Sequence, residues 1–185
     1  MFLELIAAAA AAQAQPTQPA SPPPTDGARQ RATVIMSEDE GDRRFQEEWG
    51  YADAIVAGDT IYVSGVVASL RPGETGYEAA YTRAFDRIGA TLRRVGASWN
   101  DVVEISSFHT DLVSQMPAIV AVKNRYVRPP FPAWTAVGVT RLIPGSGITE
   151  IRVIASRVRQ RDDPGQSRGT QNAPLSTLVR RSDEA

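Results

Sequence analysis

The middle of the chain alternates between segments with the hydrophobic period of a strand and segments with that of a helix. From Tyr77 to Val95, apolar side chains recur at steps of three and four residues, which places them on one face of an α-helix. Before this helix, the Val- and Ile-rich runs Ala52–Ala57 and Thr60–Val67 are separated only by Gly58 and Asp59, a connection typical of a β-hairpin. The pattern predicts a mixed α+β domain.

The complete predicted order is β-β-β-α-β-α-β-β, with two helices on one face of one mixed sheet. The remaining predicted elements are strands at Ala32–Met36, Asp101–Thr110, Trp134–Val139 and Ile148–Val158, and a helix capped by Ser114 that ends at Arg128. The sheet's second face also needs cover. We expect a second copy of the chain to supply it through Ile151, Val153 and Ala155, which makes the protein a homo-oligomer.

Composition excludes several kinds of chemistry. The chain has no Cys and a single His, so disulfides, thiolate zinc sites, Cys nucleophiles and multi-His metal sites are excluded, and we predict no metal site. Its 20 basic and 21 acidic residues give a net charge of −1, which argues against nucleic-acid binding. Lys123 is the single lysine and therefore the sole lysine candidate for Schiff-base chemistry.

Both ends of the chain differ from a folded domain in composition. Residues 1–14 form a short apolar run ending in Ala-Gln-Ala, which resembles a secretory signal peptide and is too short to span a bilayer; the alternative is a disordered Ala-rich leader. We expect a Pro-rich linker at 15–30, the domain at 31–159 and a disordered tail at 160–185. If the leader is a functional signal peptide, we expect the protein to be periplasmic or secreted. If the leader is not functional, we expect the protein to be cytoplasmic.

An ordered set of short segments resembles the Rid family, the reactive intermediate deaminases of YjgF type. The set covers nearly the whole predicted domain and comprises Gly50-Tyr51-Ala52, Ile61-Tyr62-Val63-Ser64-Gly65, Ser107-Phe108-His109-Thr110-Asp111-Leu112, Phe131-Pro132-Ala133-Trp134, Val139-Thr140-Arg141-Leu142 and Glu150-Ile151-Arg152-Val153-Ile154-Ala155. The resemblance implies a chorismate-mutase-like fold and a homotrimer with three small-molecule clefts between its subunits. It also implies hydrolysis of 2-imino acids and their enamine tautomers to 2-keto acids and ammonia, without a metal or cofactor.

Part of the family's ligand-binding site is retained in this sequence. Tyr51 matches the family's tyrosine at the mouth of the cleft. Ser64 and Gly65 match its Ser-Gly pair, where backbone groups approach the ligand. The resemblance therefore implies that these three residues bind the ligand.

Three other positions depart from the family's pattern. Trp134 stands where the deaminating members have the arginine that binds the substrate carboxylate, Arg152 where members often have glutamate, and Lys123 where some members have a ligand-contacting asparagine. Trp carries one N–H donor and no charge, so it cannot replace a bidentate arginine. We hypothesise that Arg152 supplies the anion-binding charge and that Trp134 supplies a stacking wall.

The sequence leaves alternatives open for three polar residues. Glu150 shares a strand face with Arg152 and either pairs with a cation or activates the attacking water. His109 is either a buried, hydrogen-bonded residue or a general acid or base near the cleft. Lys123 lies on the apolar face of a short helix and either extends to solvent or reaches the cleft.

Two functions follow from these residues. The first is an enzyme that hydrolyses imine or enamine intermediates, with Glu150 and Arg152 as catalytic candidates and Tyr51, Ser64 and Gly65 binding the substrate. The second is a non-catalytic trimer whose cleft binds a small anionic or aromatic metabolite, with Trp134 stacking on it. Neither function requires a nucleic acid or a membrane span.

Overall fold

A computed structural model describes residues 27–157 of the chain. The predicted signal peptide at 1–14, most of the linker at 15–30 and the tail at 160–185 lie outside the described residues. No helix within residues 27–157 has the length and apolar character needed to cross a membrane. The predicted strand and helix order is present, with one additional helix near its beginning.

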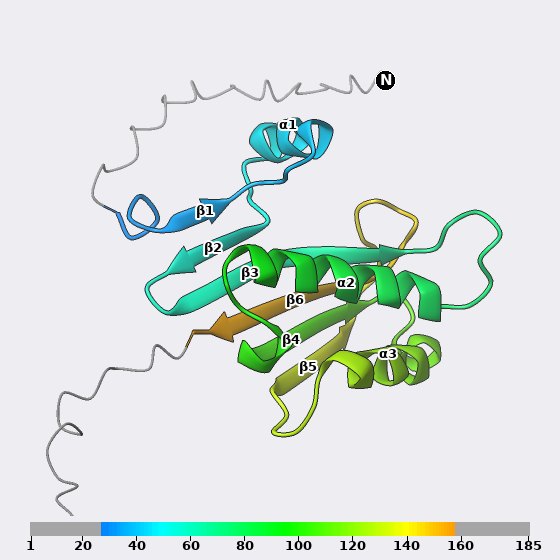
Figure 1. Cartoon of the computed structure of the whole chain (residues 1–185). Coiled ribbons are helices and arrows are strands. Elements are labelled where there is room, and N and C mark those ends of the chain that lie inside the picture. Colours follow the sequence, from blue (N-terminus) through cyan, green and yellow to red (C-terminus); the bar gives the residue numbers. More distant parts are fainter. Residues whose placement is uncertain (1–26, 158–185) are drawn as a thin grey trace, which may run out of the picture.

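The strands form one six-stranded mixed sheet in the spatial order β1-β2-β3-β6-β4-β5 (Figure 1). Neighbouring strands are antiparallel, except that β4 and β5 run parallel. The predicted hairpin joins β2 to β3, and Gly58 at its turn has a φ of 61°. The strands are β1 Thr33–Ile35, β2 Ala54–Ala57, β3 Thr60–Ser69, β4 Val102–His109, β5 Ala133–Gly138 and β6 Gly147–Ser156.

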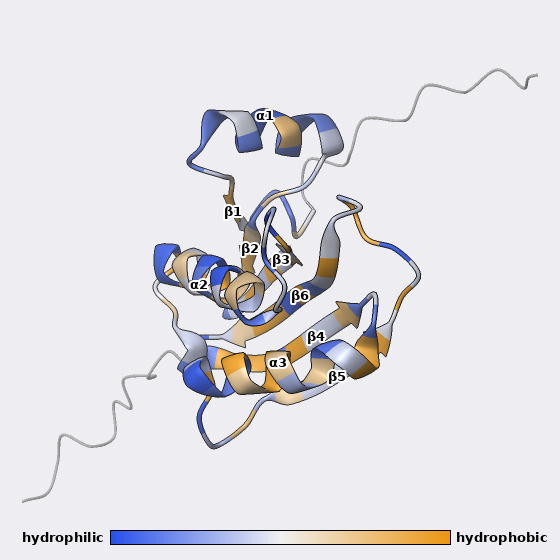
Figure 2. Cartoon of the chain, turned by 90° about the vertical axis from the view of Figure 1, so that its right-hand side faces the viewer, coloured by the Kyte–Doolittle hydropathy of each residue, from blue (hydrophilic) through white to orange (hydrophobic). Residues whose placement is uncertain are grey.

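The helices α2 (Glu78–Arg94) and α3 (Leu112–Tyr126) lie side by side across one face of the sheet (Figures 1 and 2). The start of α3 differs from the prediction. Its N-cap is Asp111, whose carboxylate accepts a hydrogen bond from the backbone N–H of Ser114, so the predicted cap Ser114 lies within the first turn.

The two predicted helices are both present, but a third helix, α1 (Glu40–Trp49), which the sequence did not predict, lies between β1 and β2 in sequence. It is capped by Asp39 and ends at Gly50, which has a left-handed φ of 71°. Nearly all of its side chains are exposed and none belongs to the hydrophobic core, so it has no apolar stripe from which a helix would be predicted. In Figure 1 it lies beyond the sheet's β1–β2 side, away from α3.

The hydrophobic core fills the space between the sheet and the two helices α2 and α3. Ile151, Val153 and Ala155 of β6 are fully buried in it, so our prediction that they form the surface between copies was wrong. The register explains the difference, because these residues pair with Val66, Val63 and Ile61 on the helix-covered side of β3.

The opposite face of the sheet carries no helix (Figure 2). Strand alternation places Glu150, Arg152 and Ile154 of β6 on this uncovered face, beside Phe108 of β4 and Tyr62 of β3. Tyr62 is 43% exposed in the single chain, which is unusual for a tyrosine in a central strand. The face that needs cover is therefore the one that contains Glu150 and Arg152.

Candidate functional site

The candidate site includes a β-bulge in β3. Between the pairs Val63–Val153 and Val66–Ile151 the register shifts, so that Ser64 and Gly65 together lie opposite Arg152. Ser64 is held in place by two hydrogen bonds: its backbone N–H donates to the carbonyl of Asp53 at 2.9 Å, and its hydroxyl donates to the carbonyl of Ala52 at 2.6 Å. The bulge thus bends the strand at the Ser-Gly pair that the sequence singled out.

Glu150 lies directly over Gly65. A Cβ added at position 65 would stand 2.8 Å from the Cγ of Glu150, closer than real Cβ contacts come, so only glycine leaves room for this carboxylate. Glu150 forms no ion pair with any residue of the described chain. The ion-pair alternative therefore finds no support, and the carboxylate faces open space.

That space is a cleft of about 1200 Å³ that we call the bulge cleft. Four of the predicted residues line it, namely Tyr51, Ser64, Gly65 and Glu150. The other contributors were not predicted from the sequence. They come from α1, the segment before β2, the rest of β3, α2 and the loop between β5 and β6: Asp42, Phe45, Trp49, Asp53, Val66, Val67, Ser69, Arg87, Thr91, Arg141, Leu142, Ile143 and Pro144.

Three aromatic rings form one wall of the bulge cleft. The ring centroids of Phe45 and Trp49 lie 4.7 Å apart, and Tyr51 meets Phe45 edge-on at 6.2 Å. Phe45 and Trp49 were missed because both belong to α1, which the hydrophobic pattern did not reveal. Arg141 was part of a family-like segment, but nothing in its spacing placed it in the cleft.

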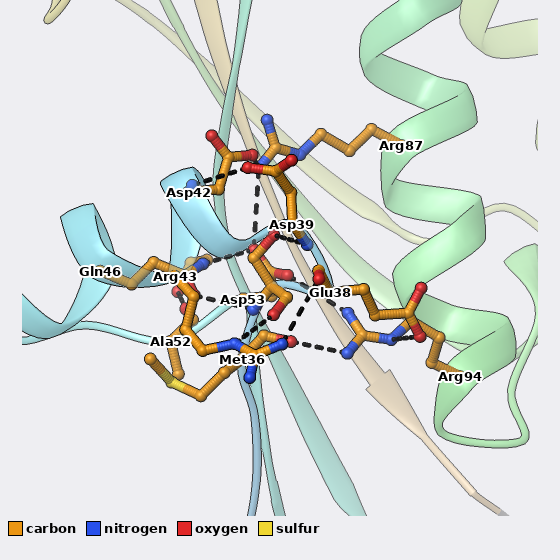
Figure 3. A network of polar contacts seen from close by, with 12 residues as sticks. Met36, Glu38, Asp39, Asp42, Arg43, Gln46, Ala52, Asp53, Arg87 and Arg94 are labelled. Carbon is orange, nitrogen blue, oxygen red and sulfur yellow. Dashed lines mark hydrogen bonds and ion pairs between the residues drawn. The ribbon is translucent and has the colours of Figure 1, made fainter.

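The carboxylate of Asp53 ties α1 to the rest of the domain (Figure 3). It accepts a 2.7 Å hydrogen bond from the side-chain amide of Gln46 in α1, and it pairs with Arg94 of α2 at 3.3 Å. The carbonyl oxygen of the Gln46 side chain accepts a 2.8 Å bond from the backbone N–H of Ser37, and Gln46 is only 1% exposed. This network, and not the hydrophobic core, positions the aromatic wall.

Replacing Asp53 with Ala should loosen α1. The buried amide of Gln46 would lose its acceptor, and an unsatisfied buried donor costs about 1–3 kcal/mol. Urea unfolding should show a loss of that size, and hydrogen exchange should accelerate at the amides of residues 40–49. Glu40→Ala is the control, because its pair with Arg44 is exposed and should be worth less than about 1 kcal/mol. Unchanged exchange in α1 of the Asp53 variant would contradict this account.

Lys123 and Trp134 lie elsewhere, in a second pocket of about 350 Å³ that we call the lysine pocket. It lies between α3 and the start of β5. The Lys123 ammonium is 5.0 Å from the centre of the Trp134 ring, and the Trp134 indole N–H donates to the hydroxyl of Ser107 at 3.0 Å. The pocket is lined by Ile105, Val120, Lys123, Asn124, Phe131, Pro132 and Trp134.

Arg152 lines neither of these two pockets. It lies on the uncovered face, where its guanidinium is 4.0 Å from the carboxylate of Glu104. Trp134 pairs with the buried Ile105 and therefore projects from the helix-covered side. Within one chain the structure thus separates Arg152 and Trp134 by the thickness of the sheet, and our hypothesis that they act together does not hold there.

His109 is fully buried and also lines neither pocket. Its Nε2 is 2.9 Å from the hydroxyl of Ser107, and its Nδ1 is 3.1 Å from that of Thr149 and 3.2 Å from the Gln115 side-chain oxygen. Burial lowers the pKa of His109, and the bond with Gln115 opposes that shift in part. Of the two alternatives for His109, the structure agrees with the buried, hydrogen-bonded one.

The pH dependence of stability should report the burial of His109. The pKa of His109 is lower in the folded chain than the value of about 6.5 expected in the unfolded chain. At pH values between these two pKa values, the unfolded chain therefore binds more protons than the folded chain. Stability should therefore fall as pH decreases below about 6.5, by at most about 1.4 kcal/mol per pH unit. Urea unfolding at pH 7.0 and 5.5 should show a smaller decrease for His109→Gln. Because the chain has one histidine, equal decreases would contradict this assignment.

The predicted ligand-binding residues thus form two separate groups in one chain. Tyr51, Ser64, Gly65 and Glu150 share the bulge cleft, whereas Lys123 and Trp134 share the lysine pocket. Residues 27–157 contain no group of three or more His, Asp or Glu side chains placed to hold a metal ion. The described part of the chain is thus an α+β domain with two separate pockets, the bulge cleft and the lysine pocket.

The chain belongs to the family described as Endoribonuclease L-PSP, whose model matches residues 42–157. It is 41% identical over 119 residues to the RutC family protein YjgH of Escherichia coli (strain K12), covering 62% of this chain and 88% of YjgH. It is 33% identical over 108 residues to a 2-iminobutanoate/2-iminopropanoate deaminase of Dermatophagoides farinae, covering 56% of this chain and 83% of the deaminase.

The solved structure of the protein YjgH has the same fold. It matches with a TM-score of 0.58 at 37% identity, over 69% of this chain and 98% of that structure. The resemblance to the Rid, or YjgF, family and the α+β fold with one mixed sheet are therefore confirmed.

Proposed function

We propose that this protein hydrolyses the C=N bond of small 2-imino acids, or of their enamine tautomers, to a 2-keto acid and ammonia. The observation that carries the proposal is the Glu150 carboxylate, which lies against Gly65 in the bulge cleft and has no cationic partner within the described chain. A relative that is named an iminobutanoate and iminopropanoate deaminase supports the same reaction class.

The proposed reaction needs a base and a proton donor but no cofactor. Glu150 takes a proton from water as the water oxygen bonds to the imine carbon, and it delivers that proton to the nitrogen, which gives a tetrahedral carbinolamine. The same carboxylate then takes the hydroxyl proton of the carbinolamine and passes it to the nitrogen, so that ammonia leaves while the C=O bond forms. General acid–base assistance of this kind contributes roughly 10²–10⁴ in rate.

We further propose that each site is assembled between two copies of the chain in a homotrimer. The separation of the bulge cleft from the lysine pocket supports this arrangement, because a head-to-tail contact would join the bulge cleft of one copy to the lysine pocket of the next. The uncovered sheet face, with exposed Tyr62 and Val137, supplies apolar surface for such a contact. Arg152 then lies at or near the interface.

The endoribonuclease activity in the family's description is not part of this proposal. Binding a nucleic acid relies on a basic surface that displaces counterions from phosphates. In this chain 20 basic residues are balanced by 21 acidic ones. A small anionic or apolar substrate suits that balance better.

The test uses the purified full-length protein and a 2-imino acid generated in situ by an amino-acid oxidase. Semicarbazide traps the surviving imine, and the rate of its loss reports hydrolysis. We expect the wild type to accelerate the loss above the rate without protein. If no acceleration is seen, but a 2-keto acid binds, the protein is a non-catalytic small-molecule binder, and the proposal of hydrolysis fails.

A further inference from the structure

Lys123 is a buried cation without an anionic partner. The side chain starts from α3 and is 9% exposed, yet its ammonium lines the lysine pocket. No carboxylate of residues 27–157 forms an ion pair with it. Its hydrogen bond is to the side-chain oxygen of Asn124, at 2.9 Å. Burying a charge in this way is unfavourable unless something compensates it.

Two aromatic rings hold the ammonium at the pocket. Its nitrogen is 5.0 Å from the centre of the Trp134 ring and 5.8 Å from that of Phe131. At these distances the ring faces attract a cation, and they also block the approach of bulk water. Trp134 itself donates a hydrogen bond to Ser107, which orients the ring that the ammonium contacts. The aromatic contacts compensate only part of the cost of burial, since burial still lowers the pKa of the Lys123 amine.

We infer that Lys123 is the carboxylate-binding group of this protein, and that Trp134 and Phe131 bind the apolar part of the same ligand. The ligand class is a small carboxylate with a flat or apolar body, and its negative charge supplies the counter-charge that the pocket lacks. The identity of this carboxylate as a 2-imino acid rests on the proposed function. The binding role of Lys123 does not depend on turnover.

The three arginines near the candidate site are weaker choices for this role. Arg87 lines the bulge cleft but already pairs with the carboxylates of Asp42 and Asp53. Arg152 already lies near the carboxylate of Glu104 on the uncovered face. Arg141 lines the bulge cleft on an exposed loop and has no buried surroundings to strengthen its attraction for an anion. Lys123 combines burial, an unbalanced charge and a stacking surface in one pocket.

The test compares three probes that differ by one group each. 4-Phenyl-2-oxobutanoate carries both the phenyl ring and the carboxylate, 4-phenyl-2-butanone has a methyl group in place of the carboxylate, and 2-oxobutanoate lacks the ring. Calorimetry should show that the wild type prefers the first probe to the ketone. Lys123→Met keeps the side-chain length and should weaken binding of the carboxylate by roughly ten- to hundred-fold, as expected for a charge-assisted hydrogen bond. Binding of the ketone should change less than about threefold.

Further variants identify the residue responsible. Arg141→Ala and Arg152→Ala should keep most of the preference for the carboxylate. If either variant abolishes that preference while Lys123→Met retains it, the inference is wrong. It is also wrong if the wild type does not discriminate between carboxylate and ketone. Circular dichroism melting curves establish that each variant is folded.

A third measurement separates anion binding from covalent chemistry. Because Lys123 is the single lysine, cyanoborohydride reduction in the presence of 4-phenyl-2-oxobutanoate gives an unambiguous peptide map. We expect Lys123 to be labelled no faster than the N-terminal amine, since a charged ammonium does not attack a ketone. Faster labelling of Lys123 would show a Schiff base and overturn the anion-binding role.

The outcomes distinguish this inference from the proposed function. Imine hydrolysis by the wild type together with unchanged carboxylate binding by Lys123→Met would refute the inference and leave the function standing. A Lys123-dependent preference for carboxylates without any imine hydrolysis would refute the proposed function and leave the inference standing.

Discussion

The Glu150→Gln variant is expected to hydrolyse 2-imino acids roughly 10²–10⁴-fold more slowly than the wild type, because an amide cannot accept the proton of the attacking water. Its shape is nearly that of Glu, so the bulge cleft should stay intact. Calorimetric binding of 4-phenyl-2-oxobutanoate should therefore change little. The semicarbazide assay with the in situ imine measures the rate.

Glu104→Gln is the matched control for this substitution. Glu104 lies on the same uncovered face, beside Arg152, but lines neither of the two pockets. The Glu104→Gln variant should hydrolyse 2-imino acids at a rate within about twofold of the wild type. If Glu150→Gln keeps its full rate, Glu150 is not the base and the water must be activated by another group.

Gly65→Ala tests the same assignment through geometry. The new methyl group would occupy the space of the Glu150 side chain, 2.8 Å from its Cγ, so the carboxylate must move. The rate should fall although no ionisable group has been removed. Glu150 is partly exposed and its side chain can turn outward, so the melting temperature should change far less than the activity.

The second large effect is expected when two variants with strongly reduced activity are mixed. Glu150→Gln damages the bulge cleft, whereas Lys123→Met damages the lysine pocket. If each site combines the bulge cleft of one copy with the lysine pocket of the next, unfolding and refolding the two variants together produces some sites with neither lesion. For random assembly, about one quarter of the sites should be intact, so activity should return to about one quarter of the wild-type value.

Two controls accompany the mixing experiment. Each variant refolded alone should keep its low activity, and the Glu150→Gln, Lys123→Met double variant refolded with wild type shows how far a damaged subunit inhibits its neighbours. Light scattering should report a trimer for every sample. Absence of recovered activity in mixed trimers would mean that both pockets act within one chain or that only one of them matters.

The sequence predicted most of the sheet and the two large helices correctly. The hairpin at Gly58, the amphipathic face of α2 and the alternation of β6 each depend on neighbours a few residues apart, and such local patterns are visible in a sequence. The predicted site residues Ser64, Gly65 and Glu150 do lie together in one cleft. These features required only local periodicity and the resemblance to a known family.

Three features could not be derived from the sequence. Helix α1 is stabilised by its caps and by the polar contacts around Asp53, which join residues far apart in the chain. The alternation of β6 gave two faces correctly, but which of them meets the helices depends on how β6 pairs with β3 and β4. Strand pairing also explains why Arg152 and Trp134, which the family resemblance led us to place in one cleft, lie on opposite sides of the sheet.

The sequence by itself determined the class of fold, the absence of thiol chemistry and the identities of the polar residues available for a site. The tertiary structure alone decided which of these residues meet. It placed the Glu150 carboxylate over Gly65, gave Lys123 an aromatic pocket without an anion, and separated the two pockets within one chain. The physical reason is that local patterns follow from the hydrophobic period of a single segment, whereas contacts between side chains follow from strand register and packing, which involve the whole domain.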